Sequence, residues 1–233
     1  MNQETLALGM IRYIVFLFST TCHEAAHALA AKLGGDETAS RGGQVSLNPL
    51  PHIQREPFGM VIFPLLALFL GGAMLGWASA PYDPLWQRRY PRRAAWMSLA
   101  GPAANFVLVL LAALIIRAGI AFGAFHPPSF INSYNMVEAA HPGYAEGLAK
   151  LISILFSLNL MLGTFNLLPI PPLDGFSVLG LFTTESMARR LEDLRDTIGA
   201  FSMLGLMLGW KMFEYLYSPI FHGAIAMLYP GLY

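Results

Sequence analysis

Residues 6–33, LALGMIRYIVFLFSTTCHEAAHALAAKL, form an almost unbroken apolar stretch that is long enough to cross a lipid bilayer as one α-helix. Arg12 and Lys32 lie near the ends of this stretch, and three further ionisable residues, His23, Glu24 and His27, lie between them. Placing such a side chain at membrane depth costs roughly 2.5–3.5 kcal/mol on insertion scales, so these residues seldom occur there without an interaction partner or a function. The stretch therefore predicts a membrane helix that carries a functional site.

The ionisable residues have the spacing His-Glu-x-x-His, which is typical of zinc-dependent hydrolases. Histidines at i and i+4 share one face of a helix, so both imidazoles can reach a single metal ion. Glu24 is suited to act as the general base that activates a water molecule. A catalytic zinc usually has three protein ligands and one open position. Glu24 is poorly placed to be the third ligand, because it lies about 100° around the helix from His23.

Asp174 is the best candidate for the missing ligand. It follows the proline-rich break in residues 166–175, NLLPIPPLDG. Irregular backbone at membrane depth is tolerated only where protein or a water-filled cavity surrounds it. An aspartate in such a place is costly unless it reaches water or holds a cation. We therefore expect His23, His27 and Asp174 to bind one Zn²⁺ per chain.

The composition favours a membrane protein over a soluble domain. Of the 233 residues, 55% are hydrophobic and 12% are charged, and the mean hydropathy is +0.52. A soluble domain is about 25% charged. The formal net charge of zero gives no sign of nucleic-acid binding, and a single cysteine excludes an intramolecular disulfide. We expect an all-α, multi-pass protein of the cell membrane with the lipid bilayer as its surroundings; the oligomeric state stays open.

The hydrophobic pattern predicts five to six segments in two parts. Residues 1–179 would form the core, and residues 180–233 would add an interfacial helix and C-terminal membrane segments suited to a lateral gate. In the polar loop 36–57, residues 44–47 predict a short strand or hairpin edge near the site. The expected hydrophobic segments are 6–33, 58–80, 94–122, 148–168, 200–217 and 220–228, and the interfacial helix is expected at 185–196.

The position of the candidate ligands constrains the topology. The two histidines and Asp174 each lie near the C-terminal end of their own segment, so a shared metal requires those ends to lie on the same side of the bilayer. One of the two segments between them must then fail to cross. Residues 58–80 are the better candidate, because Pro64 and Gly71-Gly72 allow a re-entrant hairpin; a full crossing is the alternative. Arginines flanking this segment favour a site nearer the cytoplasmic side.

Three motifs occur together and in order: His-Glu-Ala-Ala-His at 23–27, Ala-Gly-Pro-Ala-Ala-Asn at 100–105, and the run from Asn166 to Gly175. In this respect the chain resembles the site-2 protease family of intramembrane zinc metalloproteases, in its compact bacterial and archaeal form without a PDZ domain. The resemblance covers about residues 10–179. Members of this family cleave membrane-spanning segments of other proteins, often releasing regulators from the membrane (regulated intramembrane proteolysis).

The resemblance implies roles for individual residues. His23, His27 and Asp174 would bind zinc, and Glu24 would be catalytic. Asn105 and Asn166 would hold the backbone of the substrate. For Asn105, a hydrogen bond to a neighbouring helix is an equal alternative, because the small residues before it permit close helix approach.

The expected function is therefore hydrolysis of peptide bonds within or near transmembrane segments, by zinc-activated water with Glu24 as general base. Two other classes stay open: a membrane transporter or ion pathway, since buried His, Glu and Asp also mark such pathways, and a non-catalytic metal-binding relative that binds membrane proteins. The substitution Glu24→Gln separates them, because only the protease loses proteolysis while it keeps zinc.

Overall fold

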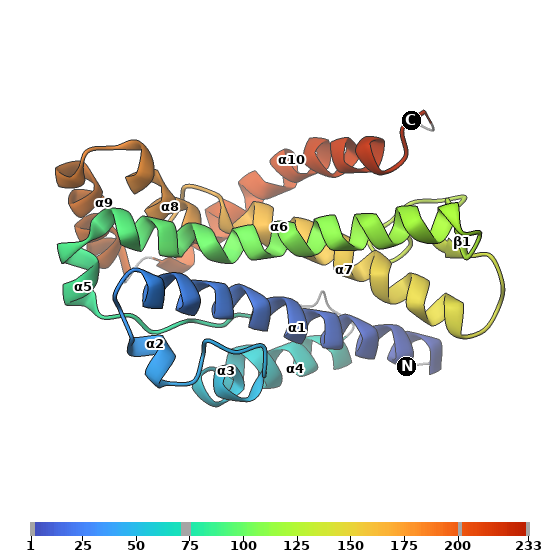
Figure 1. The fold of residues 1–233 in the computed structure, drawn as a ribbon, viewed down its shortest axis with the longest axis horizontal. Helices are drawn as coiled ribbons and strands as arrows, with labels where there is room; N and C mark the ends of the chain where they lie inside the picture. The colour runs from blue at the N-terminus through green and yellow to red at the C-terminus, as the bar shows by residue number, and fades with distance from the viewer. Residues whose placement is uncertain (1–2, 71–75, 200–201, 232–233) are drawn as a thin grey trace.

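The computed structural model of the chain describes residues 3–70, 76–199 and 202–231, and it is built almost wholly of helices, as predicted. Three long helices lie side by side through its centre (Figure 1). In the described residues, these three are the helices of sufficient length and hydropathy to cross a membrane. They are α1 (Gln3–Leu33), α6 (Pro91–Ala121) and α7 (Tyr144–Asn166), which confirms the segments predicted at 6–33, 94–122 and 148–168.

The outward and inward faces of these helices differ in the way expected of membrane helices. On α6, Leu110 and Leu114 point outward with 63% and 66% of their surface exposed. Ala28 of α1 and Ala112 of α6 are fully buried. Small residues at helix contacts allow close backbone approach, while apolar side chains on the outside suit lipid.

The segment at 58–80 turns back on itself. Helices η1 (Phe58–Ile62) and α4 (Phe63–Phe69) follow α3 (Leu50–Arg55). The backbone N–H of Trp77 then donates to the carbonyl of Gly59 at 3.1 Å, so the chain has returned to its starting level. The predicted turn at residues 71 and 72 lies outside the described residues. The chain returns as the predicted hairpin requires, and α1 and α7 finish at the same end of the bundle (Figure 1).

We call that end of the bundle the site end, and the opposite end the far end. The site end contains the last turns of α1 and α7 and the first turns of α6 (Figure 1). Helix α9, which is the predicted interfacial helix, docks here: Gln87 donates to Glu192, and Arg195 Nη1 donates to Ser177 Oγ at 2.9 Å. The short elements of the site end are α2 (Thr38–Arg41), α5 (Pro84–Arg89), α8 (Asp174–Val178), η2 (Leu179–Phe182) and α9 (Glu185–Ile198).

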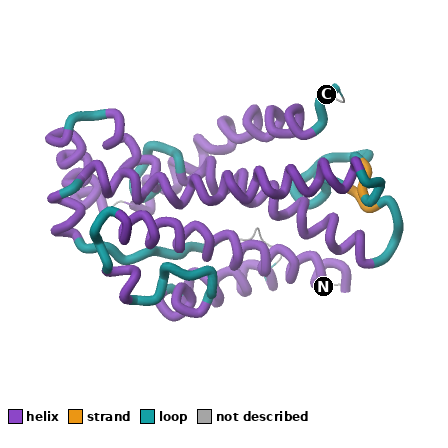
Figure 2. The backbone as a smooth tube through the Cα atoms, in the orientation of Figure 1, coloured by secondary structure: helices purple, strands orange, loops and turns teal. Residues whose placement is uncertain are grey.

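The strand predicted at residues 44–47 is wrong. Residues 45–47 form bends, because Gly43 has φ +74° and the N–H of Gln44 donates back to Ala39 at 3.0 Å, which closes the end of α2. The two described strands pair antiparallel instead at the far end, between α6 and α7 (Figure 2). They are β1 (Phe125–His126) and β2 (Glu138–Ala139).

The C-terminal part differs from its prediction as well. Residues 202–228 form the single helix α10 (Ser202–Leu228), where the sequence predicts two segments; residue 200 lies outside the described residues. The break was expected near Pro219, yet this proline lies inside the helix. A proline removes one backbone hydrogen bond, which neighbouring helices can compensate for in a membrane bundle. Tyr217 of α10 donates its hydroxyl to the carbonyl of Ser157 on α7 at 3.3 Å.

Candidate metal centre

Helix α1 presents His23 and His27 near its C-terminal end. Its sequence contains no proline, and it finishes where Gly35 adopts φ +98°, a left-handed conformation that favours glycine. The N–H of Asp36 donates to Ala31 at 2.9 Å and that of Gly35 donates to Lys32 at 3.1 Å. This pair of bonds is a Schellman ending. It fixes the end of the helix less than two turns after His27.

Asp174 begins helix α8, directly after the proline-rich break. A Cβ at Gly175 would overlap the backbone of Leu167 and Leu168, so only glycine lets α8 pack this closely against the end of α7. The hydrogen bond from Arg195 to Ser177 holds the same short helix from the side of α9. Asp174 is thereby held between α7 and α9.

The three predicted ligand side chains converge on one point. His23 Nε2 lies 3.0 Å from His27 Nε2 and 3.1 Å from Asp174 Oδ2, and His27 Nε2 lies 3.4 Å from the same oxygen. Ligand atoms about 2.0–2.1 Å from one tetrahedral zinc ion lie about 3.3 Å apart. The triangle therefore has the size that zinc requires. It is the one such group of His, Cys, Asp and Glu in the part of the chain that the structure describes.

The outer nitrogen of each imidazole is held by a neighbour on α6. His27 Nδ1 lies 2.7 Å from the carbonyl oxygen of Met97, and His23 Nδ1 lies 2.6 Å from Asn105 Oδ1. A carbonyl oxygen can only accept, so the proton of His27 resides on Nδ1 and its Nε2 is free to bind a metal. Such outer partners set the tautomer and the orientation of metal-binding histidines.

Gly101 leaves the space that the two imidazoles occupy. A Cβ built at this position would collide with Nε2 of both His23 and His27. The backbone of α6 at Gly101 thus lies directly beside the Nε2 atoms of both imidazoles. A side chain at position 101 would occupy the space of these two nitrogens.

Glu24 is 5% exposed, and its Oε2 atom has no hydrogen-bond partner among the described residues. A buried carboxylate oxygen without a partner is costly, unless it meets a water molecule or a metal ion when the site is loaded. This orphaned oxygen next to three converging ligands fits a centre that binds a metal and a water molecule.

The two asparagines predicted from the family resemblance have different surroundings. Asn166 ends α7, and its Nδ2 donates to the carbonyl of Leu162 at 3.1 Å. Asn105 is fully buried and contacts His23 through its oxygen and Asn159 Oδ1 through its nitrogen, the latter at 2.8 Å. A contact of either residue with substrate stays a prediction.

Sequence reasoning missed Asn159 and Ser19. Asn159 is fully buried in α7, and its Nδ2 donates to Ser19 Oγ at 2.8 Å. One signal was present, because an asparagine in the middle of an apolar segment is a polar residue at membrane depth. Ser19 also lies four residues before His23, on the same helix face.

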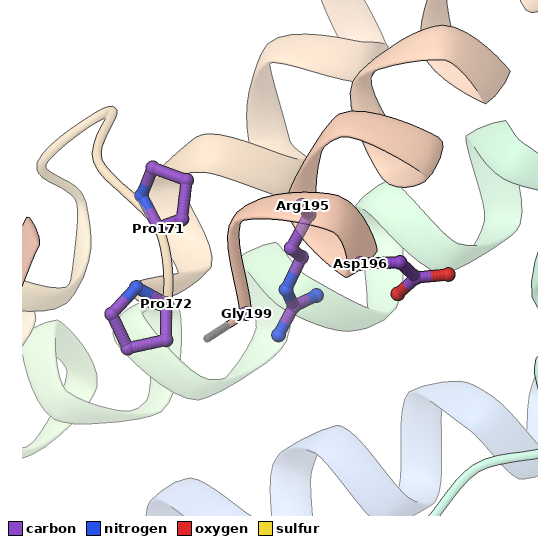
Figure 3. A pocket seen from close by; sticks show the side chains of 5 residues that line it. All are labelled: Pro171, Pro172, Arg195, Asp196 and Gly199. Atoms are coloured by element: carbon purple, nitrogen blue, oxygen red, sulfur yellow. The ribbon is translucent and has the colours of Figure 1, made fainter. Parts of the chain in front are cut away.

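A cavity of about 290 Å³ lies beside the metal centre rather than at it. Pro171 and Pro172 form one wall, and Arg195, Asp196 and Gly199 at the end of α9 form the other (Figure 3). The candidate ligands do not line it. The cavity separates the break before Asp174 from the end of α9.

Comparison with known proteins decides the family. The family model described as "Peptidase family M50" matches residues 11–209. The chain belongs to peptidase family M50. This M50 peptidase is a zinc metalloprotease whose candidate zinc ligands are the side chains of His23, His27 and Asp174. No solved structure matches the chain.

Two relatives are similar over most of this M50 peptidase. YwhC of Bacillus subtilis (strain 168) is 34% identical over 175 residues, which cover 74% of this chain and 69% of YwhC. Rip2 of Mycolicibacterium smegmatis is 32% identical over 164 residues, which cover 70% of this chain and 54% of Rip2. The names of both relatives contain the words zinc metalloprotease. The matched region thus spans about half of the length of Rip2.

Proposed function

We propose that this M50 peptidase hydrolyses peptide bonds within or next to the membrane-spanning segments of other membrane proteins. The observation that carries the proposal is the convergence of His23, His27 and Asp174 between three apolar helices. A peptide bond that reaches this centre must come from a segment that is stable among apolar helices. Membrane-spanning helices of other proteins are such segments.

The chemistry divides between the metal and one side chain. The two imidazoles and Asp174 would hold a zinc ion, which would polarise a carbonyl group and lower the pKa of a water molecule, so that hydroxide would be available as the nucleophile at neutral pH. Glu24 is the residue that accepts the proton of the attacking water and returns it to the departing amine.

The centre is proposed to lie nearer the cytoplasmic side. Arg41 ends α2 and Arg55 ends α3, in the segment that connects α1 to η1, and four more arginines lie at positions 88, 89, 92 and 93 in α5 and the start of α6. Cytoplasmic loops carry an excess of Lys and Arg. A site at this end would release the cytoplasmic part of a substrate.

The function is tested by comparing membranes from cells that contain the wild-type protein or the Glu24→Gln variant, with chemical labelling of newly formed N-termini and mass spectrometry. We expect N-termini inside membrane-spanning segments with the wild type, and a decrease of about 10²–10⁴-fold in their amount with Glu24→Gln. Zinc content should be equal in both proteins. Glu37→Gln is the matched control, because Glu37 is an exposed glutamate that pairs with Arg41.

Two results would overturn the proposal. Equal amounts of these N-termini with and without Glu24 would point to a relative that binds membrane proteins without cutting them. Zinc- or proton-coupled flux into vesicles with no new N-termini would instead favour a transporter.

A further inference from the structure

A chain of buried hydrogen bonds leads away from the metal centre and connects all three long helices. His23 Nδ1 lies 2.6 Å from Asn105 Oδ1 on α6, and Asn105 Nδ2 donates to Asn159 Oδ1 on α7 at 2.8 Å. Asn159 Nδ2 donates to Ser19 Oγ on α1 and to the carbonyl oxygen of Leu155, each at 2.8 Å. Ser19 precedes His23 by one helical turn, so the chain of bonds returns to the helix where it began.

The donor and acceptor roles along this chain of bonds are set at Asn159, the residue remote from the metal centre. The Leu155 carbonyl can only accept, so the NH₂ group of Asn159 must face it, and the Oδ1 atom of Asn159 must face Asn105. The NH₂ group of Asn105 then faces Asn159, and its Oδ1 faces His23. An oxygen at that place requires a proton on His23 Nδ1. The consequence is that His23 Nε2 carries the lone pair that a metal needs.

The opposite orientation would block the centre. If Asn105 were turned by 180° about its last bond, its NH₂ group would face His23 Nδ1, and the proton of the neutral ring would then reside on Nε2. That nitrogen would point a proton at the metal position. His27 needs no such device, because the backbone carbonyl of Met97 fixes its tautomer directly.

We propose that Asn159 is a positioning residue of this enzyme: it acts through Asn105 to hold His23 in the tautomer that binds zinc. Asn105, Asn159 and Ser19 are all fully buried, so water does not compete for these bonds. Burial also makes each lost partner costly, which gives the chain of bonds one strongly preferred direction. Ser19 has a smaller part, because the Leu155 carbonyl alone suffices to orient Asn159. The inference rests on zinc being bound by His23.

The test is the zinc affinity of the purified full-length protein in detergent, measured by competition with a chromophoric chelator. Asn159→Leu removes both polar groups at similar volume, and we expect zinc affinity to fall about tenfold or more, the size seen when an outer partner of a metal ligand is lost. Asn159→Ser should act in the same direction. Its hydroxyl can bond the Leu155 carbonyl at i−4, which protects folding, but it is too short to reach Asn105.

Asn159→Asp should restore zinc affinity to within about threefold of wild type, because a protonated carboxyl offers the same acceptor to Asn105 and the same donor to Leu155. Ser19→Ala should also stay within about threefold. Ser153→Ala is the matched control. Ser153 is fully buried in the same helix and accepts bonds from the N–H groups of Met136 and Val137, so its loss should lower thermal stability and leave zinc affinity unchanged.

The absorption spectrum of the Co²⁺-substituted protein gives a second readout. The wild type and Asn159→Asp should share one set of ligand-field bands, and Asn159→Leu and Asn159→Ser should show altered or weakened bands. The inference is overturned if the folded Leu or Ser variant binds zinc with wild-type affinity, or if the Asp variant is as weak as the Leu variant. Zinc binding by the wild type in the same experiment would leave the proposed function intact.

Discussion

The helical bundle is packed in two different ways at its two ends. At the site end, the contacts between α1, α6 and α7 include buried polar and small residues such as Asn105, Asn159 and Gly101. At the far end, α6, α7 and α10 meet through a cluster of large apolar side chains that includes Ile116, Phe156 and Tyr229. Close polar packing places atoms where chemistry needs them, whereas apolar packing supplies stability without specifying a site.

This difference means that zinc binding and stability should respond to different substitutions. Changes at residues in contact with the ligands should affect zinc more than folding, and changes in the apolar cluster of the far end should affect folding more than zinc. A variant that breaks this separation would show that the two ends are energetically coupled.

The largest effect is expected from Asp174→Ala. The variant keeps both imidazoles and the whole far end, but it lacks the one ligand that comes from outside α1. We expect loss of bound zinc on dialysis and loss of peptide-bond cleavage, with helical content by circular dichroism unchanged. Asp193→Ala, which removes an exposed aspartate of α9, should keep both zinc and cleavage. Retention of a full zinc equivalent by Asp174→Ala would rule out this aspartate as a ligand.

Phe156→Ala tests the far end. Phe156 is 2% exposed within the apolar cluster. Its truncation should lower the free energy of unfolding by about 3 kcal/mol, because a large buried side chain leaves a cavity. Zinc affinity of the folded protein should stay at the wild-type value. Leu110→Ala on the outer face of α6 is the control and should change stability little; a marked fall in zinc affinity for Phe156→Ala would refute the separation.

Gly101→Ala tests the close approach of α6 to the ligands. The added methyl group would push both imidazoles from their positions, so zinc affinity should fall by about 10–100-fold, as for other disturbances of ligand orientation. Gly147→Ala is a matched control, since a Cβ there has no neighbour within 4 Å among the described residues. Equal zinc affinity of the two variants would mean that the imidazoles have more room than their contacts indicate.

A smaller effect is expected from a carboxylate in the loops of the site end. Asp36 accepts hydrogen bonds from the N–H and hydroxyl of Thr38 and from the N–H of Asp83. Burial alone raises the pKa of Asp36, but these bonds outweigh it, and its pKa lies below the ordinary value. The carboxylate therefore stabilises the fold above about pH 4, the pKa of an unfolded aspartate, and this contribution is lost as the pH falls through the lower folded pKa.

We accordingly expect Asp36→Asn to be about 1 kcal/mol less stable than the wild type at pH 7. The difference should shrink as the pH is lowered below 4. Thermal unfolding in detergent at several pH values measures it. A difference that is independent of pH would mean that the loop is held by its shape rather than by the charge of Asp36.

Much of the site could be predicted because its chemistry follows from the spacing of residues that lie close together in the sequence. The i and i+4 positions of His23 and His27 place both side chains on one helix face. Asp174 could be predicted because an aspartate after a proline-rich break at membrane depth is costly unless it reaches water or binds a cation. The return of the segment 58–80 also followed, from the requirement that the ends of α1 and α7 meet.

Other features depend on packing that sequence does not show. The bond between Asn105 and His23 requires the actual distance between α1 and α6, so the alternatives for Asn105 stayed open. Asn159 lies 54 positions from its partner on α6. The bends at residues 45–47 arise because Gly43 lets the chain turn back onto Ala39, and the continuity of α10 through Pro219 depends on its neighbours.

The central claim is that one zinc ion is bound jointly by α1 and the segment after α7. Anomalous diffraction at the zinc absorption edge, from crystals of the purified protein, tests it most directly. We predict one peak per chain, within about 2.0–2.2 Å of His23 Nε2, His27 Nε2 and a carboxylate oxygen of Asp174. A zinc peak bound by other residues, or no peak between these three side chains in zinc-replete protein, would contradict the account.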